Sequence, residues 1–307
     1  TRMLPGALVR ELGYTEVMDP AASSVFASAT RVDLRDLTCS DAVGELYDSL
    51  QRLLDIPAEE SVCVVVGPSR NVTGTEVIDE SQAIAEAMVV AWARERGGAA
   101  VAVLETNSPL PVEDLGETAA ACRPGLNIER DSHFYQICLS ALSEEQEEQF
   151  VCSKTKYREP TGAIVCSGGT GVIGMAVAEY LASDCRADIV LLSRSGKADE
   201  ARLEKMRRFG ARVEVLACDV TDPVSVTSTL TRIRTEHGGI RAISHAAGSS
   251  GGGFLEKATP GSLEATLWPK VRGALNLEAA TRDDDLEFFL LHSSWLSTLI
   301  VPGQGEY

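Results

Sequence analysis

The chain has 307 residues, 44% of them hydrophobic, and a formal net charge of −17 at pH 7. This composition is typical of one large or two smaller globular domains, and the acidic charge argues against a nucleic-acid or anionic-membrane partner. No apolar run is long enough to cross a membrane and no signal peptide is evident, so we expect a cytoplasmic protein.

Eight cysteines are spread along the chain, without a CxxC pair or a histidine at metal-ligand spacing. Several lie inside apolar runs, where cysteine behaves as a small core residue. We therefore expect reduced thiols, no structural disulfide and no metal site.

The first half alternates helical and strand-like segments. Apolar residues of 41–55 share one helical face, VCVVVG at 62–67 predicts a buried strand, and a helix at 80–95 and a strand at 99–105 follow. This order predicts a βαβ unit with a parallel sheet. The turn at 67–71 lacks the glycine spacing that a pyrophosphate requires, so this half resembles a nucleotide-binding fold that binds no nucleotide.

A charged stretch with few apolar residues separates the two halves. It extends from residue 143 to 160 and includes SEEQEEQ and KTKYREP. Such runs are usually solvated helices or linkers. We therefore divide the chain into residues 1–157 and 158–307.

The most informative motif is a glycine-rich turn between two strands. The apolar run 163–166 precedes it, helical spacing follows, and a second strand occupies 188–192. Glycines let a pyrophosphate approach the backbone, and a helix start supplies unpaired N–H donors with a partial positive charge. A glycine turn alone is weak evidence, whereas one flanked by both strands predicts a dinucleotide site. Its predicted members are Gly168, Gly169, Thr170, Gly171, Val172, Ile173 and Gly174.

The residues after the second strand indicate which dinucleotide is bound. An NAD site usually has an acidic residue there for the ribose 2′-hydroxyl, whereas this chain has Ser193, Arg194 and Ser195. The donor fork of a guanidinium matches a 2′-phosphate. The sequence therefore predicts NADPH.

Two later strand ends complete the predicted cofactor site. Asp219 is placed to accept a hydrogen bond from the adenine amino group, and small residues in SHAAG let the backbone lie against ribose and nicotinamide. For the side chains of His245 and His292 we favour a structural role. The members of the cofactor site in these two segments are Cys218, Asp219, Val220, His245, Ala246, Ala247 and Gly248.

A further group of residues suits ketone reduction. A strand at 287–292 leads to Ser294, and Tyr307 follows thirteen residues later. Tyrosine can protonate a developing alkoxide if a nearby cation lowers its pKa from about 10, and a serine hydroxyl can hold the carbonyl oxygen. Lys270 is the candidate cation. Each residue alone could be an ordinary surface or turn residue, but their order together indicates catalysis.

These motifs resemble the short-chain dehydrogenase/reductases, and more closely the ketoreductase domains of type I polyketide synthases and animal-type fatty acid synthases. SGGTGVIG, LLSRSG, ACDV, SHAAG, PKVRGALNL, HSS and GQGEY occur in that family's order over 160–307. The family's lysine precedes its serine, as Lys270 does here. The resemblance implies that Tyr307 is the proton donor, Ser294 the oxyanion holder and Lys270 the electrostatic helper.

The resemblance also implies an architecture and a reaction. We expect an α/β protein of two Rossmann-like subdomains with parallel sheets, the first a degenerate structural subdomain and the second a catalytic short-chain dehydrogenase/reductase fold. The implied reaction is NADPH-dependent reduction of a β-ketoacyl thioester on the phosphopantetheine of an acyl carrier protein, with neighbouring synthase domains in the same polypeptide. Since the family continues past the tyrosine with an asparagine and a lid, we expect this chain to be C-terminally incomplete.

Two alternatives stay open. One is a reductively inactive scaffold or epimerase, against which Lys270, Ser294 and Tyr307 argue. The other is a stand-alone reductase of small ketones, against which the appended first half argues. For the alcohol configuration, Pro302 matches the family's B type, although the acidic motif of that type is missing near 250–253.

Overall fold

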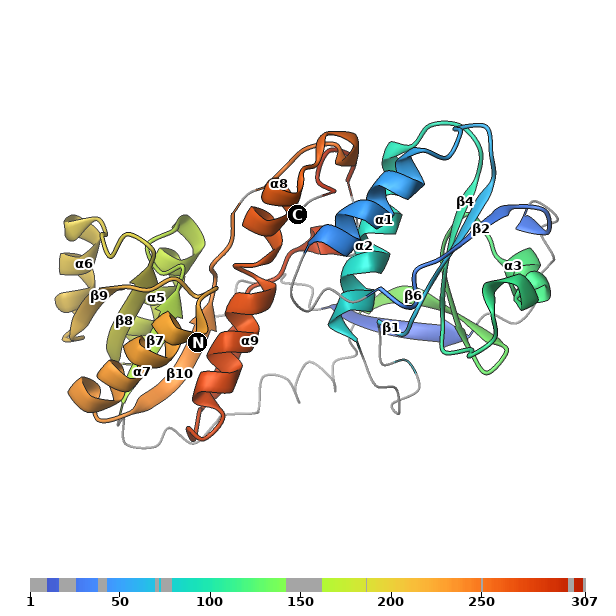
Figure 1. Ribbon diagram of the computed structural model, residues 1–307. Helices are drawn as coiled ribbons and strands as arrows, with labels where there is room; N and C mark the ends of the chain where they lie inside the picture. The colour runs from blue at the N-terminus through green and yellow to red at the C-terminus, as the bar shows by residue number, and fades with distance from the viewer. Residues whose placement is uncertain are drawn as a thin grey trace. The chain divides into compact units, whose positions relative to one another are not determined.

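The computed structural model describes residues 10–16, 26–37, 43–69, 72, 79–141, 162–185, 187–249, 251–297 and 301–305. They form two compact units, shown in Figure 1. Strands β1–β6 belong to the first unit together with residues 252–260 and the described part of 299–306, and strands β7–β11 belong to the second. The expected division between residues 157 and 158 lies outside the described residues and stays a prediction.

The first unit contains a six-stranded sheet in the order β1-β6-β5-β4-β3-β2. Strands β2–β5 are parallel, as expected for its βαβ units. Strand β6 pairs antiparallel with β5, and β1 pairs antiparallel with β6, a feature that we did not predict. Asp131 and Ser132, both with positive φ, form the tight turn from β5 to β6, and so short a turn can join only antiparallel strands. The strands are Arg10–Glu16, Thr30–Asp33, Val62–Val66, Val101–Thr106, Gly125–Arg130 and His133–Ala141.

The helices of the first unit are α1 (Gly44–Leu54), α2 (Glu80–Glu95) and the short α3 (Gly116–Ala121), with a 3-10 turn η2 at Val112–Asp114. Asp79 caps α2, because its side chain accepts a hydrogen bond from the backbone N–H of Ser81. All five residues of β3 are buried, as expected for a strand covered on both faces.

The second unit contains a parallel five-stranded sheet in the order β11-β10-β7-β8-β9. The chain passes from β7 to β8 and β9 on one side and then crosses to β10 and β11 on the other. This doubly wound order creates a switch point between β7 and β10, where such sheets bind ligands. The strands are Ala163–Ser167, Asp188–Ser193, Val213–Ala217, Ile240–His245 and Phe288–Leu291.

Alternate residues of these strands pack against helices on opposite faces of the sheet. Ile164 and Leu191 belong to one buried cluster, and Val165 and Leu192 to the other. Each such side chain contributes about 1.5–3 kcal/mol through burial, which makes this sheet a stable base for its loops. The helices of the second half are α5 (Val172–Cys185), α6 (Glu200–Arg207), α7 (Pro223–His237), α8 (Pro260–Leu267) and α9 (Val271–Thr281), with 3-10 turns η3 (Leu255–Lys257) and η4 (Trp295–Ser297).

Four cysteines, Cys63, Cys122, Cys166 and Cys218, are buried free thiols that pack as small core residues. In the part of the chain that the structure describes, no helix combines the length and apolarity needed to cross a bilayer. The charged stretch between the two units lies outside the described residues.

Candidate functional site

The glycine-rich turn joins β7 to α5 with no space for side chains at its key positions. Gly168 has a φ of +64°, and a Cβ there would lie 2.6 Å from the backbone oxygen of Ala246. A Cβ on Gly174 would collide with the backbone oxygen of Gly168. These contacts make glycine necessary at both positions, because the turn lies directly against the segment that follows β10.

The start of α5 offers backbone donors at the end of this turn. The helix begins at Val172, and the first intrahelical bond around the turn runs from Met175 N–H to the Gly171 oxygen at 2.9 Å. The N–H groups before Met175 therefore lack helical acceptors. Such groups at a helix start suit an anion, and a pyrophosphate is the anion that this turn predicts.

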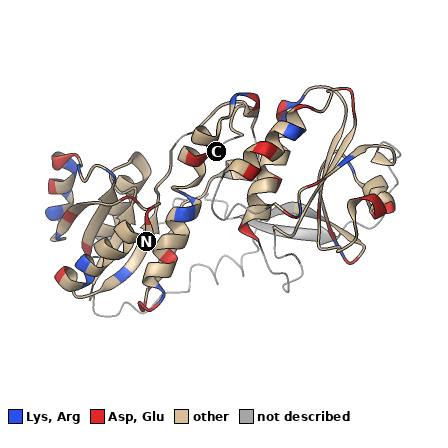
Figure 2. Ribbon diagram, viewed as in Figure 1, with Lys and Arg blue, Asp and Glu red and all other residues tan. Residues whose placement is uncertain are grey.

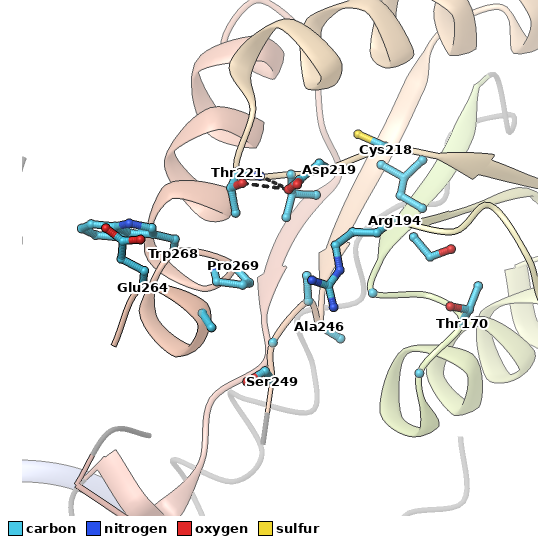
Figure 3. A pocket seen from close by; sticks show the side chains of 18 of the residues that line it. Thr170, Arg194, Cys218, Asp219, Thr221, Ala246, Ser249, Glu264, Trp268 and Pro269 are labelled. Atoms are coloured by element: carbon cyan, nitrogen blue, oxygen red, sulfur yellow. Dashed lines mark hydrogen bonds between the residues drawn. The ribbon is translucent and has the colours of Figure 1, made fainter. Parts of the chain in front are cut away.

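A cavity of about 670 Å³ opens at the carboxyl ends of β7, β8, β9 and β10 (Figure 3). Its volume is typical of cofactor and substrate sites. The structure brings together most of the predicted cofactor residues around it: Gly168, Thr170, Gly171, Ser193, Arg194, Cys218, Asp219, Val220, Ala246, Ala247 and Gly248. Residues outside the predicted cofactor set also line it: Leu192, Thr221, Ser249, Gly261, Glu264, Ala265, Trp268 and Pro269.

The remaining predicted cofactor residues do not line this cavity. Gly169 and Gly174 are packed inside the turn, and the side chains of Val172 and Ile173 are 85% and 61% exposed. Ser195 is exposed beyond Arg194. Gly174, Val172 and Ile173 can therefore serve a phosphate through their backbone, not through their side chains.

Arg194 extends from the turn after β8 toward the cavity (Figure 3). It is exposed, and among the described residues it has no ion-pair partner. Other arginines of the second unit are paired, for example Arg202 with Glu179 and Arg234 with Asp284. The Arg194 guanidinium is thus available to an anionic ligand in the cavity.

Asp219 is held in a defined orientation by Thr221. The N–H and the hydroxyl of Thr221 both donate to Asp219 Oδ1, at 2.9 and 2.8 Å (Figure 3). Both bonds use the same oxygen, which leaves Oδ2 to accept from a ligand. The sequence signal for this arrangement is the D-x-T spacing of a turn in which an Asp side chain bonds two residues ahead, a feature that we did not predict.

Lys270 occupies the N-cap of α9, directly after the cavity residues Trp268 and Pro269. Its stem lies against Gly248, because a Cβ on that glycine would be 3.3 Å from Lys270 Cε. Partial burial lowers the pKa of Lys270 below its usual value. The structure therefore places the Lys270 side chain against the cavity residue Gly248.

Ser294 follows β11 at the same edge of the sheet as Ala246. In the parallel pairing His245 lies opposite Leu291, and His292 N–H donates to the His245 oxygen at 3.1 Å. Ser294 Oγ accepts from Leu296 N–H at 3.2 Å, which starts the turn η4. Since the oxygen acts as acceptor in that bond, its own hydrogen can be donated to a carbonyl oxygen. Tyr307 lies outside the described residues.

Two histidines link neighbouring strands beneath the cavity. Ser167 Oγ is 2.5 Å from His245 Nδ1, and Ser244 Oγ is 3.0 Å from His292 Nε2. The His245 ring is buried, and a Cβ on Gly273 would be 3.0 Å from its Cε1. Burial lowers the pKa of His245 and favours the neutral ring. Its side chain therefore supports the strands and does not face the cavity.

The corresponding turn of the first unit is filled by a helix side chain. The N–H of Gly67 donates to Gln82 Oε1 at 2.7 Å, and Gln82 Nε2 donates to the carbonyls of Leu34, Arg35 and Leu37. A Cβ on Gly67 would lie 3.0 Å from Gln82 Cγ. The backbone donor that could meet a phosphate is thus already bound.

Buried charged residues occupy the neighbouring strand ends of the first sheet. Glu105 and Arg130 form an ion pair whose side chains are 0% and 1% exposed. Ser69 Oγ lies 2.5 Å from Glu86 Oε2 and 3.0 Å from Glu105 Oε2, within hydrogen-bond distance of both carboxylates. Side chains therefore fill the place where such a sheet binds a nucleotide, which explains physically why this half is degenerate.

One cluster of potential metal ligands lies away from the cavity. Ligand atoms of Glu214, Glu236 and His237 lie within 4.8 Å of one another. Arg232 forms ion pairs with both glutamates, and His237 Nδ1 contacts Asp188 at 2.7 Å. These partners already offset the carboxylate charges, so we assign no metal to this cluster.

Comparison with known proteins identifies relatives of the second half. The sequence model of the KR domain matches residues 162–307. The spectinabilin polyketide synthase system protein NorB of Streptomyces orinoci is 38% identical over 154 residues, which is 48% of this chain and 7% of NorB. The chain thus corresponds to a small part of its curated relatives.

Solved ketoreductases share the fold across both units. The ketoreductase PlmKR1 from the first module of phoslactomycin biosynthesis in Streptomyces sp. HK803 has a TM-score of 0.75 at 22% identity, over 97% of this chain and 75% of its own. The first ketoreductase of the tylosin polyketide synthase has a TM-score of 0.72 at 25% identity, over 94% and 63%. Residues 162–307 thus match the KR domain family, and the fold of both units is that of solved polyketide synthase ketoreductases.

Proposed function

We propose that this chain reduces a β-ketoacyl thioester carried on an acyl carrier protein to the β-hydroxyacyl thioester, with NADPH as reductant. The observation that carries the proposal is the cavity at the switch point of the second sheet. It combines a glycine turn at a helix start with Arg194, which has no ion-pair partner among the described residues. A pyrophosphate and a 2′-phosphate match these two features in charge and position.

The residues around the cavity have separate roles in this proposal. The start of α5 binds the pyrophosphate, Arg194 the 2′-phosphate, and Asp219 Oδ2 the adenine amino group. Ala246 to Gly248 carry no side chain beyond a methyl group, so backbone can lie flat against the nicotinamide end. When bound, NADPH supplies a hydride to the ketone carbon.

The proton reaches the substrate oxygen from the protein. Ser294 donates a hydrogen bond to the ketone oxygen and holds it as negative charge develops. Tyr307 transfers its phenolic proton to that oxygen, which completes the alcohol. In this proposal the ammonium group of Lys270 stabilises the resulting phenolate electrostatically.

The length of the relatives suggests the partners of this chain. NorB is a much longer polypeptide, of which this chain matches 7%. We therefore propose neighbouring synthase domains in the same polypeptide, a phosphopantetheine-bound substrate delivered by the acyl carrier protein, and a cytoplasmic location. The B-type configuration of the alcohol stays a prediction from Pro302.

Replacement of Tyr307 tests the reaction. In full-length Tyr307→Phe, we expect the rate of NADPH oxidation with a β-ketoacyl thioester or trans-decalone to fall by about 10²–10⁴-fold, because the general acid is lost. NADPH fluorescence should show unchanged cofactor binding. Tyr180→Phe, at an exposed tyrosine of α5, is the control and should keep full turnover. Normal turnover by Tyr307→Phe would show that Tyr307 is not the proton donor.

The same assays separate the alternatives. Wild-type protein that enhances NADPH fluorescence without oxidising it would indicate an inactive or epimerising domain. Free small ketones reduced as efficiently as the carrier-bound thioester would indicate a stand-alone reductase.

A further inference from the structure

A buried histidine joins the two central strands of the second unit. Ser167 ends β7 and His245 ends β10, and the two residues lie opposite each other in the parallel pairing. Both are almost fully buried, and Ser167 Oγ lies 2.5 Å from His245 Nδ1. One nitrogen of the ring therefore has a fixed hydroxyl partner at the switch point of the sheet.

The other side of the ring lies against the start of α9. A Cβ on Gly273, in the first turn of that helix, would be 3.0 Å from His245 Cε1 and 3.4 Å from His245 Nε2. Glycine at this position thus lets the ring approach the helix closely. His245 Nε2 is buried and has no hydrogen-bond partner of good geometry among the described residues. A buried polar atom of this kind is costly unless a polar group lies close by.

The backbone before α9 supplies such a group. Burial lowers the pKa of His245, and the backbone groups of Lys270 and Pro269 lie close enough to the ring to oppose this effect. The helix start is irregular here, because the Gly273 N–H donates to the Trp268 oxygen, five residues back, at 3.0 Å. Among the described residues, no backbone N–H donates to the Pro269 oxygen. That oxygen can therefore accept from the ring of His245.

Lys270 is contacted from two sides by the segment that ends β10. His245 approaches its backbone, and a Cβ on Gly248, three residues later, would be 3.3 Å from Lys270 Cε. Lys270 is also the N-cap of α9, so a shift of the helix start moves its Cα and its ammonium group together. The position of the ammonium relative to Gly248 therefore depends on how the ring holds the helix start.

We propose that His245 is a positioning residue for ketone reduction: its neutral ring accepts from the Ser167 hydroxyl at Nδ1, donates from Nε2 to the backbone before α9, and so fixes the Lys270 side chain against Gly248. This inference rests on the proposed function, in which the Lys270 ammonium stabilises the phenolate formed on proton transfer. The ring itself contacts neither cofactor nor substrate, because it acts through the backbone of another residue.

Four variants of the full-length protein test the proposal. His245→Ala removes both contacts of the ring, His245→Gln keeps a donor that can reach the place of Nε2, and Ser167→Ala removes only the hydroxyl partner. His237→Gln is the matched control. The His237 ring is also buried in the second unit, but its partners are Asp188 and Glu214, away from the cavity.

Two measurements report on the position of Lys270 without any turnover. The pH dependence of Lys270 acetylation by acetic anhydride, followed by mass spectrometry with the exposed Lys197 as reference, gives the pKa of the Lys270 amine. Amide hydrogen exchange in a peptide of 268–276 reports on the order of the helix start. The other measurements are kcat, KM, the NADPH dissociation constant by fluorescence and the thermal midpoint.

We expect His245→Ala to raise the pKa of Lys270 toward its ordinary value, because the partial burial that lowers it is relaxed. Exchange in 268–276 should rise, and kcat should fall by about 10- to 100-fold, since a small displacement of a catalytic group is costly. KM and NADPH binding should stay close to wild type, as the side chains that line the cavity are unchanged.

The other variants should follow the number of contacts that they keep. His245→Gln and Ser167→Ala should lie between His245→Ala and wild type in the pKa of Lys270, in exchange and in kcat. His237→Gln should keep the wild-type pKa of Lys270 and the wild-type kcat, even though the loss of a buried polar contact lowers its thermal midpoint.

An unchanged pKa of Lys270 together with unchanged exchange in His245→Ala would overturn the proposal, and so would an unchanged kcat. A loss of kcat that only parallels losses of NADPH binding and thermal stability would mean a structural role alone. If His245→Ala does not fold, His245→Gln and Ser167→Ala decide by the same criteria. Wild-type protein without turnover would refute the proposed function, while the pKa of Lys270 and the exchange would still show whether His245 holds the start of α9.

Discussion

At the scale of single residues, Arg194 carries the most specific information about the cofactor. Glycines at a turn after a strand suit many phosphate ligands, whereas a guanidinium in this position suits a second phosphate on the adenosine ribose. The structure adds that Arg194 lines the cavity and has no ion-pair partner among the described residues. A guanidinium that lines a cavity without an ion-pair partner favours the binding of an anionic ligand there.

Replacement of Arg194 should therefore change cofactor choice more than turnover. In Arg194→Ala we expect the dissociation constant for NADPH to rise by about 10- to 100-fold, because a charge-assisted hydrogen-bonded contact is lost. The constant for NADH should change little. Fluorescence titration with both cofactors checks this, and Arg208→Ala, at an exposed arginine beyond α6, is the matched control. Equal weakening of NADPH and NADH binding would contradict the role.

At the scale of elements, the two halves use the same strand-turn-helix unit in opposite ways. In the second unit the turn after β7 is kept clear by glycines, and the start of α5 faces a cavity. In the first unit the turn after β3 is closed by Gln82 from α2, which bonds four backbone groups. A side chain thus supplies the hydrogen bonds that a nucleotide would otherwise make.

Loss of this side chain should destabilise the first unit. Gln82→Leu removes the partner of the buried Gly67 N–H and of three carbonyls, and we expect the free energy of unfolding to fall by about 2–5 kcal/mol. Denaturant unfolding measures the change. Gln51→Leu, on the half-buried side of α1, should cost much less. A similar loss in both variants would mean that the bonds of Gln82 carry no special weight.

At the scale of the whole molecule, the chain is acidic overall, and the proposed site for an anionic cofactor lies in the second unit. The full sequence has 45 acidic and 28 basic residues. Among the described residues, both kinds occur along the elements of each unit (Figure 2). Among the described residues, the backbone donors at the start of α5 and the Arg194 side chain lie at one cavity, in the second unit. Only that unit should therefore respond to NADPH.

Ligand-dependent protection tests this division. At about 100 times its dissociation constant, NADPH should stabilise the second unit by about 2.7 kcal/mol, since only the native state binds it. Amide exchange should slow in residues 163–175 and stay unchanged in residues 62–69. Protection of the latter segment would show that the first unit binds the cofactor after all.

The sequence by itself determined the features that depend on short stretches of chain. Apolar runs such as 62–66 and 163–167 become buried parallel strands, because a strand covered on both faces must be apolar along its length. The glycines of SGGTGVIG and the following Arg194 marked the cofactor turn, because backbone approach and charge are local properties. The turn after β3 lacks the glycine spacing that a pyrophosphate requires, and this likewise predicted a half without a nucleotide.

Only the tertiary structure decided the features that depend on residues distant in the chain. It showed the antiparallel pairing of β6 with β5 and of β1 with β6, and the closing of the Gly67 turn by Gln82. It also turned the His245 side chain away from the cavity. Packing and the pairing of buried polar groups across the fold set each of these outcomes. The spacing of residues along the chain encodes none of them.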